Sequence, residues 1–162
     1  MMGKKIMYSL IAVLLLIVVA LVFFYRTIHS AEWADRAAAI QTVTASTYMR
    51  TIDKVENFVG EDSYRIVFGK DGEGKPAIAW VHEGEVHMEY EAAGVTESWV
   101  REQVMEQQEN NDILRVMPGV LNEAYVWEVL YKRKEDGMDR YYYTYYRFDN
   151  GLEVDTWKML PL

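Results

Sequence analysis

The string from His82 to His87 holds residue types that bind metal ions, two histidines with Glu83 and Glu85 between them. A zinc protease needs its two histidines four residues apart, so that both lie on one helix face. Here they are five apart, which on a helix turns the two rings about 140° away from each other. Gly84 and the alternation of polar and apolar residues after it predict a hairpin. We therefore predict solvent-facing hairpin residues, no metal site and no cofactor.

Acid–base chemistry has one candidate, Glu128, which lies between Val126 and Leu130 on one predicted strand face. The chain has 25 acidic residues, so a chance pair of carboxylates carries no information. We expect Glu128 to be buried and paired with Arg140 or Arg147, as a structural ion pair. A serine nucleophile would need a histidine base, and the histidines lie in the hairpin or beside the apolar N-terminal segment. We predict no catalytic residue and a protein that is not an enzyme.

The segment Tyr141–Tyr146 is all tyrosine except Thr144. Neighbouring residues of a strand point to opposite faces, so alternate tyrosines share a face. One face must cover a helix, whereas the other packs against a sister unit or stays exposed for a protein partner or sugar rings. The candidate partner-binding aromatics are Trp127, Tyr141, Tyr143, Tyr145 and Trp157.

The sequence predicts, twice in succession, a helix followed by a series of strands. The first helix is expected to begin near Ser30 as its N-cap. The second has Thr96 as N-cap, Glu97 in its first turn, and Val100 and Val104 as its buried stripe. The predicted strands are Val55–Val59, Ser63–Phe68, Ala77–Val81, Glu85–Tyr90, Ile113–Met117, Tyr125–Tyr131, Arg140–Phe148 and Leu152–Met159.

The turn residues between the strands of the first series correspond to those of the second. Asp71-Gly72 matches Asp136-Gly137, and Glu83-Gly84 matches Asn150-Gly151. Such dipeptides adopt the positive φ angles that tight hairpins require. The sequence therefore predicts an α+β fold of two tandem small units, residues 26–92 and 93–162. Each unit is one helix packed on an antiparallel sheet of three or four strands.

Composition excludes whole classes of function. The 162 residues contain no cysteine, which excludes disulfides, thiolate metal sites and a cysteine nucleophile. Residues 26–162 hold all 25 acidic residues and 15 of the 17 basic ones, a net charge of −10. A surface so acidic repels a phosphate backbone, so we predict no nucleic-acid partner.

The run Ile6–Tyr25 is apolar almost throughout. Its 20 residues would span about 30 Å as a helix, the thickness of the hydrocarbon core of a membrane. Lys4 and Lys5 favour a cytoplasmic N-terminus. We therefore expect a cytoplasmic tail (residues 1–5), a membrane-spanning helix in contact with lipid (6–25) and extracytoplasmic domains. A cleaved signal peptide is the alternative, but the run is longer than usual and Ile28-His29-Ser30 is a poor cleavage site.

The chain resembles the cell wall elongation regulator TseB-like family of Gram-positive bacteria. Besides the N-terminal anchor and the tandem units, the matching pieces are Asp53–Gly60 with Tyr64, Gly94-Val95-Thr96, Pro118-Gly119-Val120, Val126–Val129, Tyr142-Tyr143 and Phe148–Gly151. The tyrosine run is denser than the family pattern. The resemblance implies two cystatin-like, PepSY-related domains outside the membrane.

The resemblance also implies a function. It indicates a non-enzymatic regulator at the outer face of the cell membrane, acting by contact with a penicillin-binding transpeptidase or another membrane-bound wall synthesis protein. The alternatives left open are a peptidoglycan- or glycan-binding module, and an inhibitor or modulator of a peptidase.

Overall fold

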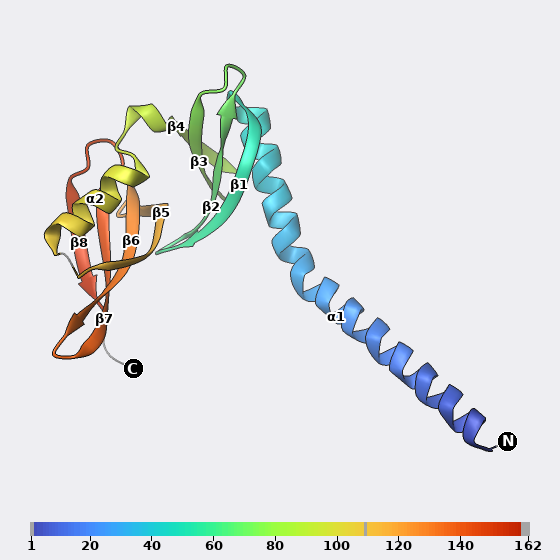
Figure 1. Cartoon of the computed structure of the whole chain (residues 1–162). Coiled ribbons are helices and arrows are strands. Elements are labelled where there is room, and N and C mark those ends of the chain that lie inside the picture. The colour runs from blue at the N-terminus through green and yellow to red at the C-terminus, as the bar shows by residue number, and fades with distance from the viewer. Residues whose placement is uncertain (1, 109, 160–162) are drawn as a thin grey trace. The chain divides into compact units, whose positions relative to one another are not determined.

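A computed structural model describes residues 2–108 and 110–159 of the protein. The fold is α+β, with one long N-terminal helix followed by two four-stranded antiparallel sheets (Figure 1). In chain order the elements are α1 (Met2–Ser46), β1 (Met49–Val59), β2 (Ser63–Asp71), β3 (Pro76–His82), β4 (Glu85–Tyr90), the short 3₁₀ helix η1 (Glu91–Ala93), α2 (Glu97–Gln107), β5 (Asp112–Leu121), β6 (Ala124–Glu135), β7 (Met138–Arg147) and β8 (Glu153–Lys158).

Helix α1 extends over two compact units of the chain, residues 1–38 and 39–162. Its part from Val13 onward is long and apolar enough to cross a membrane, with a mean hydropathy of 2.1 and no buried residue in the apolar window. The expected start of the first helix near Ser30 is wrong, because α1 begins at Met2 and continues unbroken to Ser46. Neither glycine nor proline occurs between Tyr25 and Ser46, so nothing in the sequence interrupts the helix.

The first sheet has the strand order β1-β2-β3-β4. Ala39 and Val43, in the last turns of α1, are buried with residues from one face of this sheet. That face carries small side chains at Ala77 and Ala79, which let a helix approach the strands closely. The opposite face carries larger side chains, namely Phe58, Ile66, Phe68, Ile78 and Trp80.

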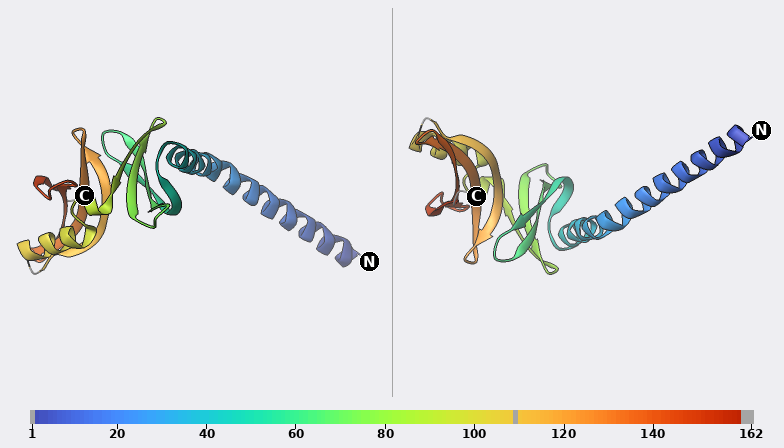
Figure 2. Two further views of the ribbon diagram at one scale, coloured as in Figure 1. Left: turned by 90° about the horizontal axis from the view of Figure 1, so that it is seen from above. Right: turned by 90° about the horizontal axis from the view of Figure 1, so that it is seen from below.

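The second sheet has the order β5-β6-β7-β8, and α2 lies along one of its faces (Figure 2). The Thr96 hydroxyl accepts a hydrogen bond from the backbone N–H of Trp99 at 3.2 Å, so the predicted N-cap is present. Val100 and Val104 are fully buried, as the spacing predicts. Trp99 packs edge-on against Tyr146, with ring centroids 6.1 Å apart.

All eight strands expected from the sequence are present, most of them longer than expected. The largest difference is β1, which begins at Met49 rather than Val55. Glu83 and Gly84 both have positive φ, as do Asp136 and Gly137, so two of the predicted turns have the backbone that tight hairpins require.

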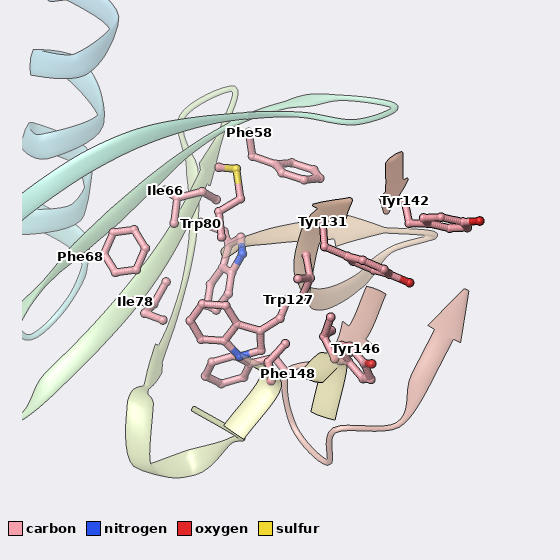
Figure 3. Close-up of a cluster of buried hydrophobic side chains, with 14 residues drawn as sticks. Phe58, Ile66, Phe68, Ile78, Trp80, Trp127, Tyr131, Tyr142, Tyr146 and Phe148 are labelled. Atoms are coloured by element: carbon pink, nitrogen blue, oxygen red, sulfur yellow. The ribbon is translucent and has the colours of Figure 1, made fainter. Parts of the chain in front are cut away.

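One aromatic core joins the two sheets (Figure 3). Trp80 of the first sheet is 1% exposed, and its ring packs edge-on against Phe148 at a centroid distance of 5.4 Å. The indole N–H of Trp80 donates to the backbone carbonyl of Gly119 at 3.1 Å. A Cβ at Gly119 would lie 2.3 Å from the Phe58 ring, so only glycine lets β5 approach that ring.

A charged cluster holds β8 to the β6–β7 hairpin. Glu135 accepts hydrogen bonds from Lys158, from the hydroxyl of Tyr142 and from Arg133, the last at 2.7 Å. The bond from Lys158, with those from Tyr142 and Arg133, lowers the pKa of Glu135 to about 2. The ionised carboxylate therefore favours the folded state, because these partners are assembled only there.

We expect Trp80→Ala to lower the free energy of unfolding by about 3–5 kcal/mol, the usual loss for deleting a buried tryptophan. The measurement is urea unfolding of the detergent-solubilised protein, followed by near-ultraviolet circular dichroism. Tyr48→Ala is the control, since Tyr48 is 74% exposed. A Trp80→Ala protein as stable as the control would contradict a core shared by the two sheets.

We expect the stabilisation from Glu135 to depend on pH. Its pKa is lower in the folded state than the unperturbed 4.5, so the stabilisation is complete above pH 4.5 and is lost as the pH falls toward about 2. Glu135→Gln should therefore be less stable than the unaltered protein at pH 7, with the difference shrinking below pH 4.5. Thermal unfolding at a series of pH values measures it. Glu102→Gln replaces an exposed side chain on α2, so its effect on stability should not change over this pH range.

Candidate functional site

A groove of about 410 Å³ opens on the face of the second sheet that α2 does not cover. One wall comes from the end of β1 and the turn after it, at Val59 and Glu61. The remaining lining comes from all four strands of the second sheet and includes Arg115, Glu128, Tyr143, Tyr145 and Trp157.

Strand register explains why these residues gather. Arg115 of β5 is opposite Leu130 of β6, which is opposite Tyr143 of β7, which in turn is opposite Trp157 of β8. Residues directly opposite each other in antiparallel strands point to the same face. Glu128 and Tyr145 form the next pair on that face, because side chains two residues apart on a strand also share a face.

Glu128 is the buried acid of the groove. Only 4% of the residue is exposed, and its carboxylate accepts two hydrogen bonds. Arg115 donates from Nη2 to Oε1 at 2.6 Å, and the Tyr145 hydroxyl donates to Oε2 at 3.1 Å. Burial, together with the negative charge of Glu128, raises the pKa of Tyr145 well above its usual value. Tyr145 therefore remains a neutral donor, and Arg115 balances the charge of the buried carboxylate.

The aromatic wall of the groove has a defined orientation. Trp157 is 48% exposed, and its ring packs against Tyr145 with centroids 5.3 Å apart and planes 61° apart. The indole N–H of Trp157 donates to the carboxylate of Asp155. Tyr143 stacks on Tyr145 at 6.5 Å and is half-buried. Trp157 and Tyr143 thus present ring surface to the groove from adjacent strands.

The structure separates the five candidate aromatics. Tyr143, Tyr145 and Trp157 line the groove, and Tyr145 forms its buried part. Trp127 points to the opposite face, is 3% exposed and donates its indole N–H to the Val95 carbonyl at 2.9 Å. It is therefore a core residue and not a surface available to a partner. Tyr141 is 41% exposed but does not line the groove.

The expected partner of Glu128 was wrong, although the acid is buried and paired as predicted. Glu128 is paired with Arg115, and neither Arg140 nor Arg147 is its partner. Arg140 lies opposite Arg133 near the hairpin end of β7, while Arg147 pairs with Asp149 at 3.1 Å.

Sequence reasoning did not find Arg115, because only the register between β5 and β6 brings it to the acid. Val59 and Glu61 were also missed, since they come from the other sheet.

The two hairpin histidines make separate contacts. Nδ1 of His82 lies 2.9 Å from the Ser63 carbonyl oxygen, and this hydrogen bond raises the pKa of His82. His87 stacks on Tyr125 at 4.0 Å, with Nε2 2.9 Å from a carboxylate oxygen of Glu89. Among the side chains that the structure describes, no three from His, Cys, Asp or Glu are grouped so that they could hold a metal ion.

Comparison with known proteins gives one match to a family model and one likeness of fold. Residues 38–82, from the last turns of α1 through β3, match the model of the cell wall elongation regulator TseB-like domain. The solved structure of the YpmB protein from Bacillus subtilis is similar to this chain with a TM-score of 0.66 and 23% identity, over 76% of this chain and 96% of that one. That likeness shows the fold. No curated protein matches this sequence.

We expect Arg115→Met to destabilise the protein by about 3 kcal/mol at pH 7, because it leaves the buried Glu128 carboxylate without its cation. Adding Glu128→Gln should restore most of the stability, since a neutral amide needs no counter-charge and still accepts from Tyr145. A double-mutant cycle in urea measures this coupling. If Arg115→Met alone costs less than about 0.5 kcal/mol, the ion pair does not support the groove.

Proposed function

We propose that this protein is a non-enzymatic regulator of cell wall elongation, because residues 38–82 match the model of the cell wall elongation regulator TseB-like domain. It acts from the outer face of the cell membrane, by contact with a penicillin-binding transpeptidase. Its two sheets with their helices would be tandem cystatin-like, PepSY-related units of a Gram-positive bacterium, spanning residues 26–92 and 93–162. The match to the TseB-like domain is the observation that carries this proposal.

Helix α1 supports the membrane anchor. Its apolar part has the length and hydropathy of a membrane span. Lys4 and Lys5 precede that part, and basic residues favour the cytoplasmic side. The strongly acidic remainder of the chain would then lie outside, where a tether keeps it close to membrane-bound wall synthases.

The chemistry of the groove supports a role in binding rather than catalysis. A general acid or base needs a carboxyl group that can exchange a proton with a substrate. Both carboxylate oxygens of Glu128 already accept hydrogen bonds, one from Arg115 and one from Tyr145. The groove therefore holds a buried acid whose hydrogen bonds are all made within the protein, beside exposed aromatic rings. Such an arrangement is suited to binding a ligand.

We expect affinity purification of the detergent-solubilised, full-length protein to enrich a penicillin-binding transpeptidase. Replacing Ile6–Tyr25 by an unrelated apolar helix of equal length should preserve this enrichment. A soluble form starting at Arg26 should capture less, because anchoring both proteins in one membrane raises their effective concentration. The control is the same N-terminal segment fused to an unrelated domain. No transpeptidase above this control would contradict the proposal.

A further inference from the structure

We propose that the groove between the end of β1 and the second sheet binds a neutral sugar chain of the N-acetylhexosamine type. This site goes beyond the proposed contact with a transpeptidase. It depends on that proposal only in that an extracytoplasmic groove has wall glycan within reach.

The aromatic surface has the form that a sugar ring requires. A pyranose has one face made of C–H groups, which stacks on an exposed aromatic ring, and a rim of hydroxyl groups. Tyr143 and Trp157 are opposite each other in neighbouring strands, so their Cβ atoms lie about 5 Å apart and both rings border the groove, with their planes inclined to each other. The Asp155 carboxylate and the Tyr145 ring hold the indole of Trp157 in place. Little side-chain freedom is then lost on binding.

Polar groups lie beside these two rings. The side chain of Arg115 is 49% exposed although one of its nitrogens is bonded to Glu128. A planar guanidinium has five N–H donors, so the remainder can serve hydroxyl or acetamido oxygens. The exposed carboxylate of Glu61 supplies acceptors from the other wall. Val59 and Leu121 provide apolar contact for an acetamido methyl group.

Charge favours a neutral ligand. Arg115 and Glu128 cancel each other inside the groove. An anionic polymer would be repelled by the net charge of −10 on residues 26–162. A cationic segment would find the buried carboxylate already bonded to Arg115 and Tyr145, so within the lining only the exposed carboxylate of Glu61 could pair with it. The volume of about 410 Å³ lies within the usual range of roughly 300–1,000 Å³ for small-ligand sites.

Two other grooves in the folded part are less suited to a sugar ring, because they lack accessible aromatic rings. One, of about 340 Å³ near the start of α2, has Phe68 and Trp127 as its aromatics, and both are buried. The other, of about 370 Å³, has Tyr125 already stacked on His87 and Phe148 in the core. Neither presents two accessible rings from adjacent strands.

The test is binding of a β-1,4-linked N-acetylglucosamine tetramer to the full-length protein, measured by titration calorimetry in a detergent without a sugar headgroup. Co-sedimentation with purified peptidoglycan is a second measurement. We expect saturable binding that Trp157→Ala weakens about tenfold, a loss of the size expected for one stacking contact. Trp157→Phe should retain most of the affinity.

Tyr141→Ala is the matched control, because this exposed tyrosine lies two residues from Tyr143 on the same strand but outside the groove. It should bind the tetramer as the unaltered protein does. The unfolding midpoint of each variant in urea shows that a loss of binding is not a loss of fold.

Three results would overturn the inference: no saturable binding by the unaltered protein, equal binding by Trp157→Ala, or equal losses in Trp157→Ala and Tyr141→Ala. A Trp157→Ala protein that loses the transpeptidase but binds the tetramer normally would make the groove a protein contact instead. Transpeptidase co-purification is scored separately, so the regulator proposal can fail while sugar binding succeeds, and the reverse.

Discussion

The packing of Trp80 against the second sheet is the constraint on which the rest of the folded part depends. A sheet with large apolar side chains on one face and alanines on the other must bury both faces. Helix α1 supplies Ala39 and Val43 for the alanine face, and the second sheet with Phe148 covers the Trp80 face. Gly119 makes this close approach possible, since any side chain there would meet the Phe58 ring.

This arrangement leaves the two sheets unequal. The first sheet is covered on both faces, whereas the second has α2 on one face and a groove on the other. The β1 end that inserts Phe58 into the shared core also carries Val59 and Glu61 to the groove wall. The contact that stabilises the pair of sheets therefore also builds the candidate site, and loss of the Trp80 contact would displace one wall of the groove.

Local patterns were enough to predict eight strands, the second helix with its Thr96 cap, and hairpins at Glu83-Gly84 and Asp136-Gly137. Period-two alternation also placed Tyr143 and Tyr145 on one face. The alternation does not say which face α2 covers, so it cannot separate Trp127, which lies in the core, from the aromatic residues that line the groove. Nor could it supply the register that brings Arg115 to Glu128, because cross-strand pairing is set by contacts between distant segments.

Protein stability alone does not explain why the groove contains the Arg115–Glu128 ion pair. Glu128 lies between Val126 and Leu130, where an apolar residue would continue the pattern of the strand. Buried ion pairs are often no more stabilising than well-packed apolar side chains of similar volume, because removing the charges from water costs free energy. Here the pair does something an apolar residue could not. It holds a half-exposed guanidinium in the groove that Tyr143 and Trp157 also line. A charge at this position is therefore explained by the hydrogen-bond donors that it offers to a ligand.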